Sequence, residues 1–149
     1  MKIVTLCLGC VVAAAGAVSL TAQDKPNLSG AWIGVDSQQQ IRELTIKQNG
    51  STLALEGRPD VISVTYTLDG SETKMSLPNG KYVVGKAAWA GTTLVVTIHD
   101  PETKQDIRKQ TWAIDRDGQL VIVTEIVGPA AARRDGKPGT PVKEVFKRR

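Results

Sequence analysis

Apolar and polar side chains alternate with a period of two through most of the chain after residue 22. In the segment 61–68, apolar side chains occupy every second position: Ile62, Val64, Tyr66 and Leu68. The same alternation recurs in three further segments: 42–48, 92–99 and 119–126. Because successive side chains of a strand point to opposite faces of a sheet, the pattern predicts half-buried β-strands. No part of this region keeps the period of an amphipathic helix.

Turn-forming dipeptides divide these segments: Asn49-Gly50, Asp69-Gly70, Asn79-Gly80, Asp117-Gly118 and Asp135-Gly136. With three further breaks at 57–60, 90–91 and 99–102, most successive turns are ten or eleven residues apart. Such dipeptides favour type I′ hairpin turns, which need a positive φ at both central residues. The segments between turns predict about ten strands: 29–35, 41–48, 52–57, 61–68, 71–76, 81–89, 92–98, 105–115, 119–127 and 141–148.

Connections this short make consecutive strands antiparallel neighbours. Closure of the sheet removes exposed edges, which otherwise invite aggregation. We therefore predict an all-β fold, an antiparallel up-and-down meander of 8–10 strands closed into a small barrel, as a single domain over residues 23–149. The one long connection, 128–141, is rich in proline, glycine and charge, and we expect it to be a mobile loop.

The first 22 residues have the layout of a secretion signal. Lys2 supplies a positive start, residues 3–20 are apolar, and Leu20-Thr21-Ala22 resembles a cleavage site, so the mature chain is expected to begin at Gln23. The alternatives are an uncleaved membrane anchor, since the apolar run is long enough to cross a bilayer, and a lipoprotein acylated at Cys10. The signal predicts a secreted or periplasmic protein that keeps no stable membrane span after cleavage.

Both cysteines of the chain, Cys7 and Cys10, lie inside this signal. The mature chain therefore has no disulfide and no thiol nucleophile. The formal net charge is only +4, and the basic residues gather at 133–134 and 147–149. Nucleic-acid-binding domains carry basic stripes interleaved with aromatic residues, which this chain lacks, so we expect no nucleic-acid partner.

His99 is the only histidine of the chain and precedes Asp100. Adjacent residues of a strand point to opposite faces, so Asp100 is poorly placed to orient His99 in a catalytic triad. We expect His99 on the surface at a hairpin tip, and the aspartates of the turns as turn formers. A single histidine without cysteine also argues against a transition-metal site. The sequence therefore predicts no enzyme activity, no catalytic residue, no metal and no cofactor.

Four aromatic residues are candidates for lining a ligand site: Trp32, Tyr66, Trp89 and Trp112. Aromatic walls with few polar groups suit a small apolar ligand. The alternative is that these rings fill the core, because side chains alone can fill a small barrel.

Glu144 lies between Val142 and Phe146 on one face of the last predicted strand. If that face points inward, the carboxylate enters the interior, where a charge must be paired or neutralised. A bulge or a position at the rim would instead leave Glu144 in water.

The stretch Asn27-Leu28-Ser29-Gly30-Ala31-Trp32 resembles the G-x-W opening of the calycins, which include lipocalins, fatty-acid-binding proteins and avidins. It also resembles the Leu-Ser-Gly-x-Trp opening of uncharacterised small secreted bacterial proteins of lipocalin-like type. In those proteins, Asp-Gly hairpins, a Trp-x-Gly-x-x-Leu strand pair and a basic last strand follow, and residues 89–94 and 144–148 match the last two features. The resemblance covers most of the mature chain.

This resemblance implies a calycin or lipocalin-like barrel, and a C-terminal arginine stacked on the first-strand tryptophan. Arg148 is the candidate, with Lys147 and Arg149 as alternatives. The chain departs from the family pattern in two ways. It lacks the Thr-Asp-Tyr motif of lipocalins, and about five residues between the first two strands leave no room for the helical lid of fatty-acid-binding proteins.

Two functions follow as expectations. The first is binding of a small hydrophobic ligand inside the barrel. The second is a structural or protein-interaction role for a barrel filled by its own side chains, with no small-molecule ligand. The oligomeric state is not predicted.

Overall fold

In the computed structural model, residues 24–35, 40–57, 63–131 and 139–149 are described. They contain ten strands: β1 (Gly30–Val35), β2 (Ile41–Asn49), β3 (Thr52–Glu56), β4 (Val64–Thr67), β5 (Asp69–Ser76), β6 (Tyr82–Ala90), β7 (Thr93–His99), β8 (Asp106–Ile114), β9 (Leu120–Ile126) and β10 (Val142–Arg148). Each of them lies within a few residues of a segment that the alternation predicts.

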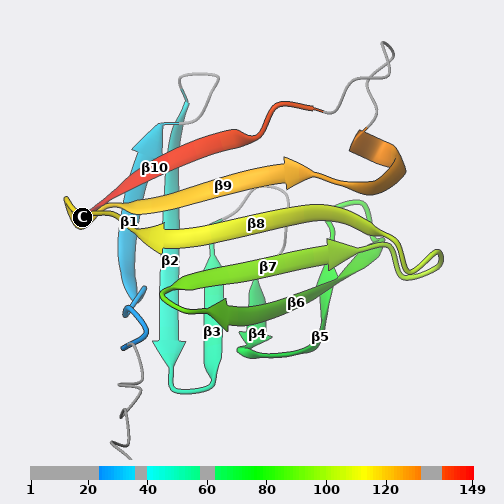
Figure 1. Cartoon of the computed structure of the whole chain (residues 1–149), viewed down its shortest axis with the longest axis horizontal. Helices are drawn as coiled ribbons and strands as arrows, with labels where there is room; N and C mark the ends of the chain where they lie inside the picture. The colour runs from blue at the N-terminus through cyan, green and yellow to red at the C-terminus, as the bar shows by residue number, and fades with distance from the viewer. Residues whose placement is uncertain (1–23, 36–39, 58–62, 132–138) are drawn as a thin grey trace, which may run out of the picture.

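The ten strands form one sheet in the order β4-β3-β2-β1-β10-β9-β8-β7-β6-β5. All pairs are antiparallel, and β1 pairs with β10, so the first and last strands lie side by side with Trp32 opposite Arg148. β4 and β5 are the two ends of the strand order and do not pair. The result is a nearly closed up-and-down barrel, which confirms the predicted fold class (Figure 1).

Two layers of strands enclose the core. In Figure 1, β1–β4 lie behind β6–β10, and the strands of the two groups cross. Side chains from the inner faces of both groups interdigitate, as in other packings of crossed sheets. They form one cluster that includes Leu44, Leu53, Tyr66, Leu94 and Trp112.

The turns are where the sequence predicts them, but their type differs. Lys104 is the only non-glycine residue with positive φ in the described part of the chain, so Asn79 and Asp117 do not adopt it. In the β5–β6 turn, the Gly80 N–H donates to the Leu77 carbonyl (3.1 Å), and Gly80 itself has φ of 78°. This is a type I turn followed by a left-handed glycine, the usual three-residue hairpin loop. The type I′ prediction was therefore wrong for these turns.

Asp69-Gly70 does not form the predicted hairpin. β5 begins at Asp69, which pairs with Ala88 of β6, and a bulge follows between Asp69 and Glu72. The chain leaves β4 here to join the other layer, and the Asp69 carboxylate accepts the Ser71 N–H (2.8 Å) within that bend. Asp135-Gly136 lies outside the described residues.

The long connection after β9 begins with a short 3-10 helix, Gly128–Ala131, where the sequence favoured an irregular loop. Gly128 has φ of 66°, and a Cβ at this position would meet the Asp106 carbonyl. Only glycine allows the chain to turn so close to β8. Residues 132–138 of the predicted mobile loop lie outside the described residues. In the part of the chain that is described, no helix is long and apolar enough to cross a membrane.

One end of the barrel is filled by side chains, and we call it the closed end. Leu53, Leu94 and Leu120 each follow a turn at this end, and none of them exposes any surface. Trp32 is 1% exposed, and its Nε1 donates to the Leu28 carbonyl (2.9 Å). In the sequence, a leucine follows two or three residues after three of the turn glycines, Gly50, Gly91 and Gly118, and these three turns lie at the closed end.

Candidate functional site

Burial on the inner face falls steadily toward the opposite end. On β9, Ile122 exposes no surface, Thr124 is half-buried and Ile126 is 44% exposed. On β10, Phe146 is 3% exposed, and Val142 is 44% exposed. The inner face therefore opens where β9 ends and β10 begins. We call this region, with Arg108, Gln110, Thr124, Ile126, Val142 and Glu144, the mouth.

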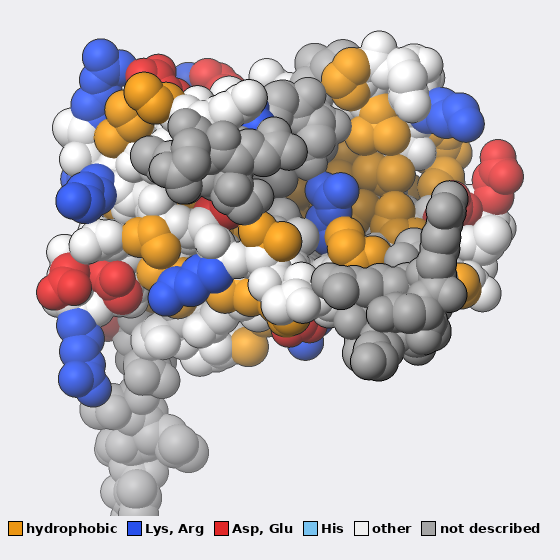
Figure 2. Space-filling model, turned by 90° about the horizontal axis from the view of Figure 1, so that it is seen from above, with side chains coloured by type: hydrophobic (Ala, Val, Ile, Leu, Met, Phe, Trp, Pro, Cys, Tyr) orange, Lys and Arg blue, Asp and Glu red, His pale blue; other side chains and the backbone are white. Residues whose placement is uncertain are grey.

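A space-filling view from above shows this opening directly. Figure 2 shows a hollow with hydrophobic side chains on its floor and a basic side chain at its edge. The hollow lies toward the side where, in Figure 1, β9 ends and β8 begins. A concave apolar surface with a few polar groups is the usual form of a small-molecule site.

A pair of polar side chains lies on the inner face of the mouth. Gln110 of β8 is only 2% exposed, and its Nε2 donates to Thr124 Oγ1 of β9 (3.0 Å). The two residues are direct cross-strand partners. Buried amides need hydrogen bonds, and this one satisfies one donor of Gln110. Gln110 Oε1 is an acceptor that this bond leaves unused.

Glu144 faces inward. Its cross-strand partner is the fully buried Ile122, and the β9–β10 register from Val142 to Phe146 is continuous, without a bulge. The side chain is half-buried. The exposure of Glu144 therefore comes from the open mouth, and the sequence-level alternative of a bulge does not hold.

The four predicted aromatic residues lie on the inner face but do not form one group. Trp89 and Trp112 are both cross-strand partners of Leu94, with Trp89 partly buried and Trp112 fully buried. Tyr66 lies on β4, where its hydroxyl contacts Met75 Sδ (2.9 Å). Trp32 lies at the closed end. A ligand contact for any of the four stays a prediction.

Trp112 carries an unusual feature. Its Nε1 is the one buried side-chain polar atom that has no hydrogen-bond partner in the described structure. Leaving a buried donor unpaired costs about 1–3 kcal/mol, so such groups are rare. The indole of Trp112 is packed between Leu94 and Ile122, and this packing contributes the compensating apolar burial.

The stacked arginine of the closed end is Arg148. Its guanidinium lies over the Trp32 ring, 4.5 Å from the centroid, and its Nη1 donates to the Ser29 carbonyl (2.7 Å). Gly30 makes room for it, since a Cβ there would lie 2.9 Å from that Nη1. The expectation that rests on the calycin resemblance is confirmed, and Arg148 is the residue among the three candidates.

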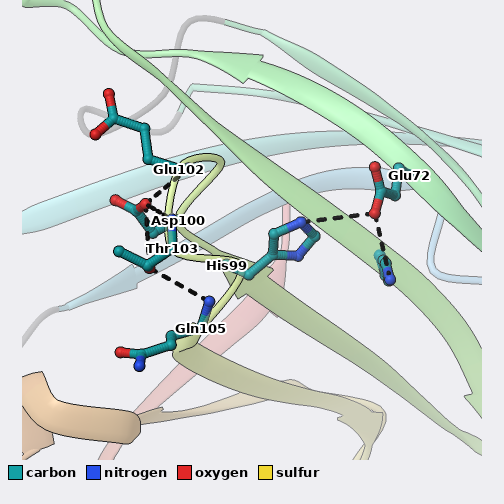
Figure 3. A network of polar contacts seen from close by, with 7 residues as sticks. Glu72, His99, Asp100, Glu102, Thr103 and Gln105 are labelled. Atoms are coloured by element: carbon teal, nitrogen blue, oxygen red, sulfur yellow. Dashed lines mark hydrogen bonds and ion pairs between the residues drawn. The ribbon is translucent and has the colours of Figure 1, made fainter.

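His99 is not at the surface, contrary to the sequence prediction. It is 4% exposed, and its Nε2 lies 3.7 Å from Glu72 Oε1, which also pairs with Lys86 (3.4 Å) (Figure 3). A register shift between Ile98 and His99 breaks the regular pairing with β8. Two consecutive side chains are buried as a result, which a strict period of two does not predict.

Asp100 acts as a turn former, as predicted. Its Oδ1 accepts the Thr103 and Glu102 N–H groups (2.8 and 2.9 Å) and the Thr103 hydroxyl (Figure 3). The backbone N–H of Thr103 is the main cause that lowers the pKa of Asp100. The carboxylate is thus committed to its own turn and does not orient His99. The described residues contain no group of three or more metal-ligating side chains.

Sequence reasoning missed Arg108, Gln110 and Thr124 as residues of the mouth. A signal was present, because Arg108 and Gln110 stand four and two positions before Trp112 and therefore share its face. The period of two identified the face, but it did not show that this end of the face stays open.

Comparisons with known proteins agree with the fold. No family model matches the chain, and no curated protein matches it. Among solved structures, a REP1-NXSQ fatty acid transporter matches with a TM-score of 0.57 and 12% identity, over 81% of this chain and 95% of that chain. A point mutant of that transporter gives 0.57 and 13% identity, over 81% and 97%.

A zebrafish ileal bile-acid-binding protein, complexed with cholic acid, matches with a TM-score of 0.58 and 18% identity, over 80% of this chain and 97% of that chain. By their descriptions, the first two are fatty acid transporters and the third is a bile-acid-binding protein. At this level of identity, the likeness bears on the fold alone: this chain is a nearly closed, antiparallel up-and-down barrel of ten strands, and these proteins share its architecture.

Proposed function

We propose that this protein binds a small hydrophobic molecule at the mouth of its barrel. The observation that carries the proposal is the loss of burial along the inner face, from Ile122 with no exposed surface to Ile126 with 44%. If the barrel served only as a stable scaffold, burial of this apolar surface would make the folded state more stable. An apolar ligand covers it instead.

The residues of the mouth differ in chemistry. Ile126 and Val142 are apolar and each 44% exposed. Gln110, Thr124 and Glu144 are polar. An apolar body with a polar group at one side matches both kinds of residue. The similar barrels are described as a fatty acid transporter and a bile-acid-binding protein, which supports the same class of ligand.

The second candidate is a filled barrel with a structural or protein-interaction role. It is favoured by the closed end, where Leu53, Leu94, Leu120 and Trp112 expose no surface at all. This packing restricts any ligand to the part of the interior near the mouth. It does not account for the apolar side chains that stay exposed there.

We also propose that the protein is exported to the periplasm or the exterior and acts without catalysis. Residues 1–22, which have the layout of a signal, support export. The commitment of Asp100 to its own turn, away from His99, supports binding over hydrolysis.

Titration with an apolar fluorescent probe and with alkyl ligands tests the proposed binding. Ile126→Asn should weaken binding, because it places an amide on the apolar wall of the mouth. Ile41→Asn is the matched control, since Ile41 is 70% exposed and lies on the outer face of β2. Equal affinities of both variants and the wild type would remove the mouth from the binding site, and absence of any binding would favour the filled barrel.

A further inference from the structure

Charged side chains on the inner face of the barrel differ in whether they have partners. Alternation along the strands places Arg42, Arg108, Glu144 and Arg148 on that face. Arg148 is held by Ser29 and Trp32. Arg42 and Arg108 each already interact with other groups of the protein. The Glu144 carboxylate makes no hydrogen bond and no ion pair with the described part of the chain.

The surroundings of Glu144 combine apolar surface with hydrogen-bond acceptors. On its own strand, Val142 and Phe146 flank it on the same face, and Ile122 lies opposite. Thr124 is its diagonal neighbour across β9, a spacing of about 7–8 Å between such residues. The hydroxyl of Thr124 already accepts from Gln110 Nε2, and Gln110 Oε1 is a second acceptor in this region. The donors that remain here, the Thr124 O–H and the second Nε2 hydrogen of Gln110, are neutral and carry no charge to match the carboxylate.

We propose that the ligand of the mouth is an amphiphile with a cationic, hydrogen-bond-donating head group, an alkylammonium in the simplest form, and that Glu144 receives this head. The inference rests on the proposed function and names the charge of its ligand. An ammonium group supplies three donors and the opposite charge. A carboxylate next to apolar surface is unfavourable without such a partner.

The same arrangement disfavours a ligand with a carboxylate head. Such a head would meet the like charge of Glu144 within the mouth, and like charges that lie close together repel. Arg108 is the basic residue of the mouth, and it already interacts with another group of the protein. The ligand charge that the geometry indicates is therefore opposite to that of a fatty acid.

Three probes of equal chain length separate the head-group classes: dodecylammonium, dodecanol and dodecanoate. Calorimetric titration below their aggregation concentrations should give the tightest binding for dodecylammonium. Glu144→Gln keeps the shape of the side chain and removes its charge. It should weaken dodecylammonium binding roughly tenfold to a hundredfold, the usual value of one hydrogen bond to a charged group. Dodecanol binding should be nearly unchanged.

Glu125→Gln is the matched control. Glu125 lies at the same end of β9 but points outward, is exposed and stands opposite Lys109. Glu125→Gln removes the same charge as Glu144→Gln. A general electrostatic effect on dodecylammonium binding would therefore appear in both variants, and an effect of the site only in Glu144→Gln. Glu144→Lys should reverse the preference and favour dodecanoate.

Two results would overturn the inference while leaving the binding function intact. The first is tighter binding of dodecanoate than of dodecylammonium by the wild type. The second is an equal loss of dodecylammonium affinity in the Glu144 and Glu125 variants. If none of the three probes binds, the proposed function itself fails, and the inference falls with it.

Discussion

Removal of the Trp32 indole is the sharpest test of how the closed end is held together. The ring is 1% exposed and donates from Nε1 to the Leu28 carbonyl. Its outer face is covered by the Arg148 guanidinium. Trp32→Ala therefore removes buried surface, one buried hydrogen bond and one cation–π contact at once.

Burial dominates the expected loss. Truncation of a buried tryptophan to alanine costs roughly 3–5 kcal/mol. The Leu28 carbonyl is then left unpaired in a buried position, and such a loss costs about 1–3 kcal/mol, part of which is already contained in the truncation value. An exposed cation–π contact contributes only about 0.5–1 kcal/mol. We expect a total near the upper end of the truncation range.

Urea unfolding, followed by far-ultraviolet circular dichroism, measures this loss independently of tryptophan fluorescence. Because small domains are stable by only about 5–15 kcal/mol, Trp32→Ala can leave too little folded protein to titrate. Two milder variants keep the test sharp. Trp32→Phe retains an aromatic ring without the N–H and should cost about 1–3 kcal/mol. Arg148→Met should cost about 1 kcal/mol or less.

A loss below about 1 kcal/mol for Trp32→Ala is typical of surface positions and would refute the assigned role of Trp32. Trp89→Ala serves as the comparison, because Trp89 is only partly buried and should lose less than Trp32. A larger loss for Arg148→Met than for Trp32→Phe would mean that the guanidinium, rather than the buried indole, holds the closed end together.

Three further predictions use other parts of the chain. The exported protein should begin near Gln23, and N-terminal sequencing that finds Met1 would contradict cleavage. Hydrogen bonds from the backbone lower the pKa of Asp100 in the folded state below 3.8. The charged carboxylate therefore stabilises the fold above that value, and this effect is lost as the pH falls through the folded pKa. Asp100→Asn should flatten the acid side of the plot of stability against pH, and an unchanged plot would show that the turn carboxylate contributes nothing. Gly85→Ala should cost about 1–3 kcal/mol through overpacking, since its Cβ would lie 2.8 Å from the Tyr66 ring; thermal unfolding checks this against Gly139→Ala, which meets no atom within 4 Å and should be neutral.

The candidate site was only partly predictable. The face that carries Trp112 follows from alternation, and Gln110 and Arg108 belong to that face. The openness of the mouth does not follow, because the exposure of Ile126 depends on what lies across the barrel from it. Likewise, the sequence identified Glu144 as an inward candidate but not its lack of a partner, which depends on the positions of Arg108 and Arg42 after folding.

The sequence by itself determined the strands and, apart from the absent β4–β5 pair, which consecutive strands are neighbours. A period of two and regularly spaced turn glycines act locally, so they define ten antiparallel strands before any long-range contact forms. Leucines directly after the turns then mark the end that packs solidly, as Leu53, Leu94 and Leu120 show.

Only the tertiary structure decided how those strands meet. The bulge that buries His99 arises from its pairing with β8, and the bend at Asp69 arises because β5 pairs with β6 and not with β4. Arg148, rather than Lys147 or Arg149, stacks on Trp32 because the β1–β10 register places it directly opposite. Register and burial are relations between distant segments, and a local pattern of apolar and polar residues does not contain them.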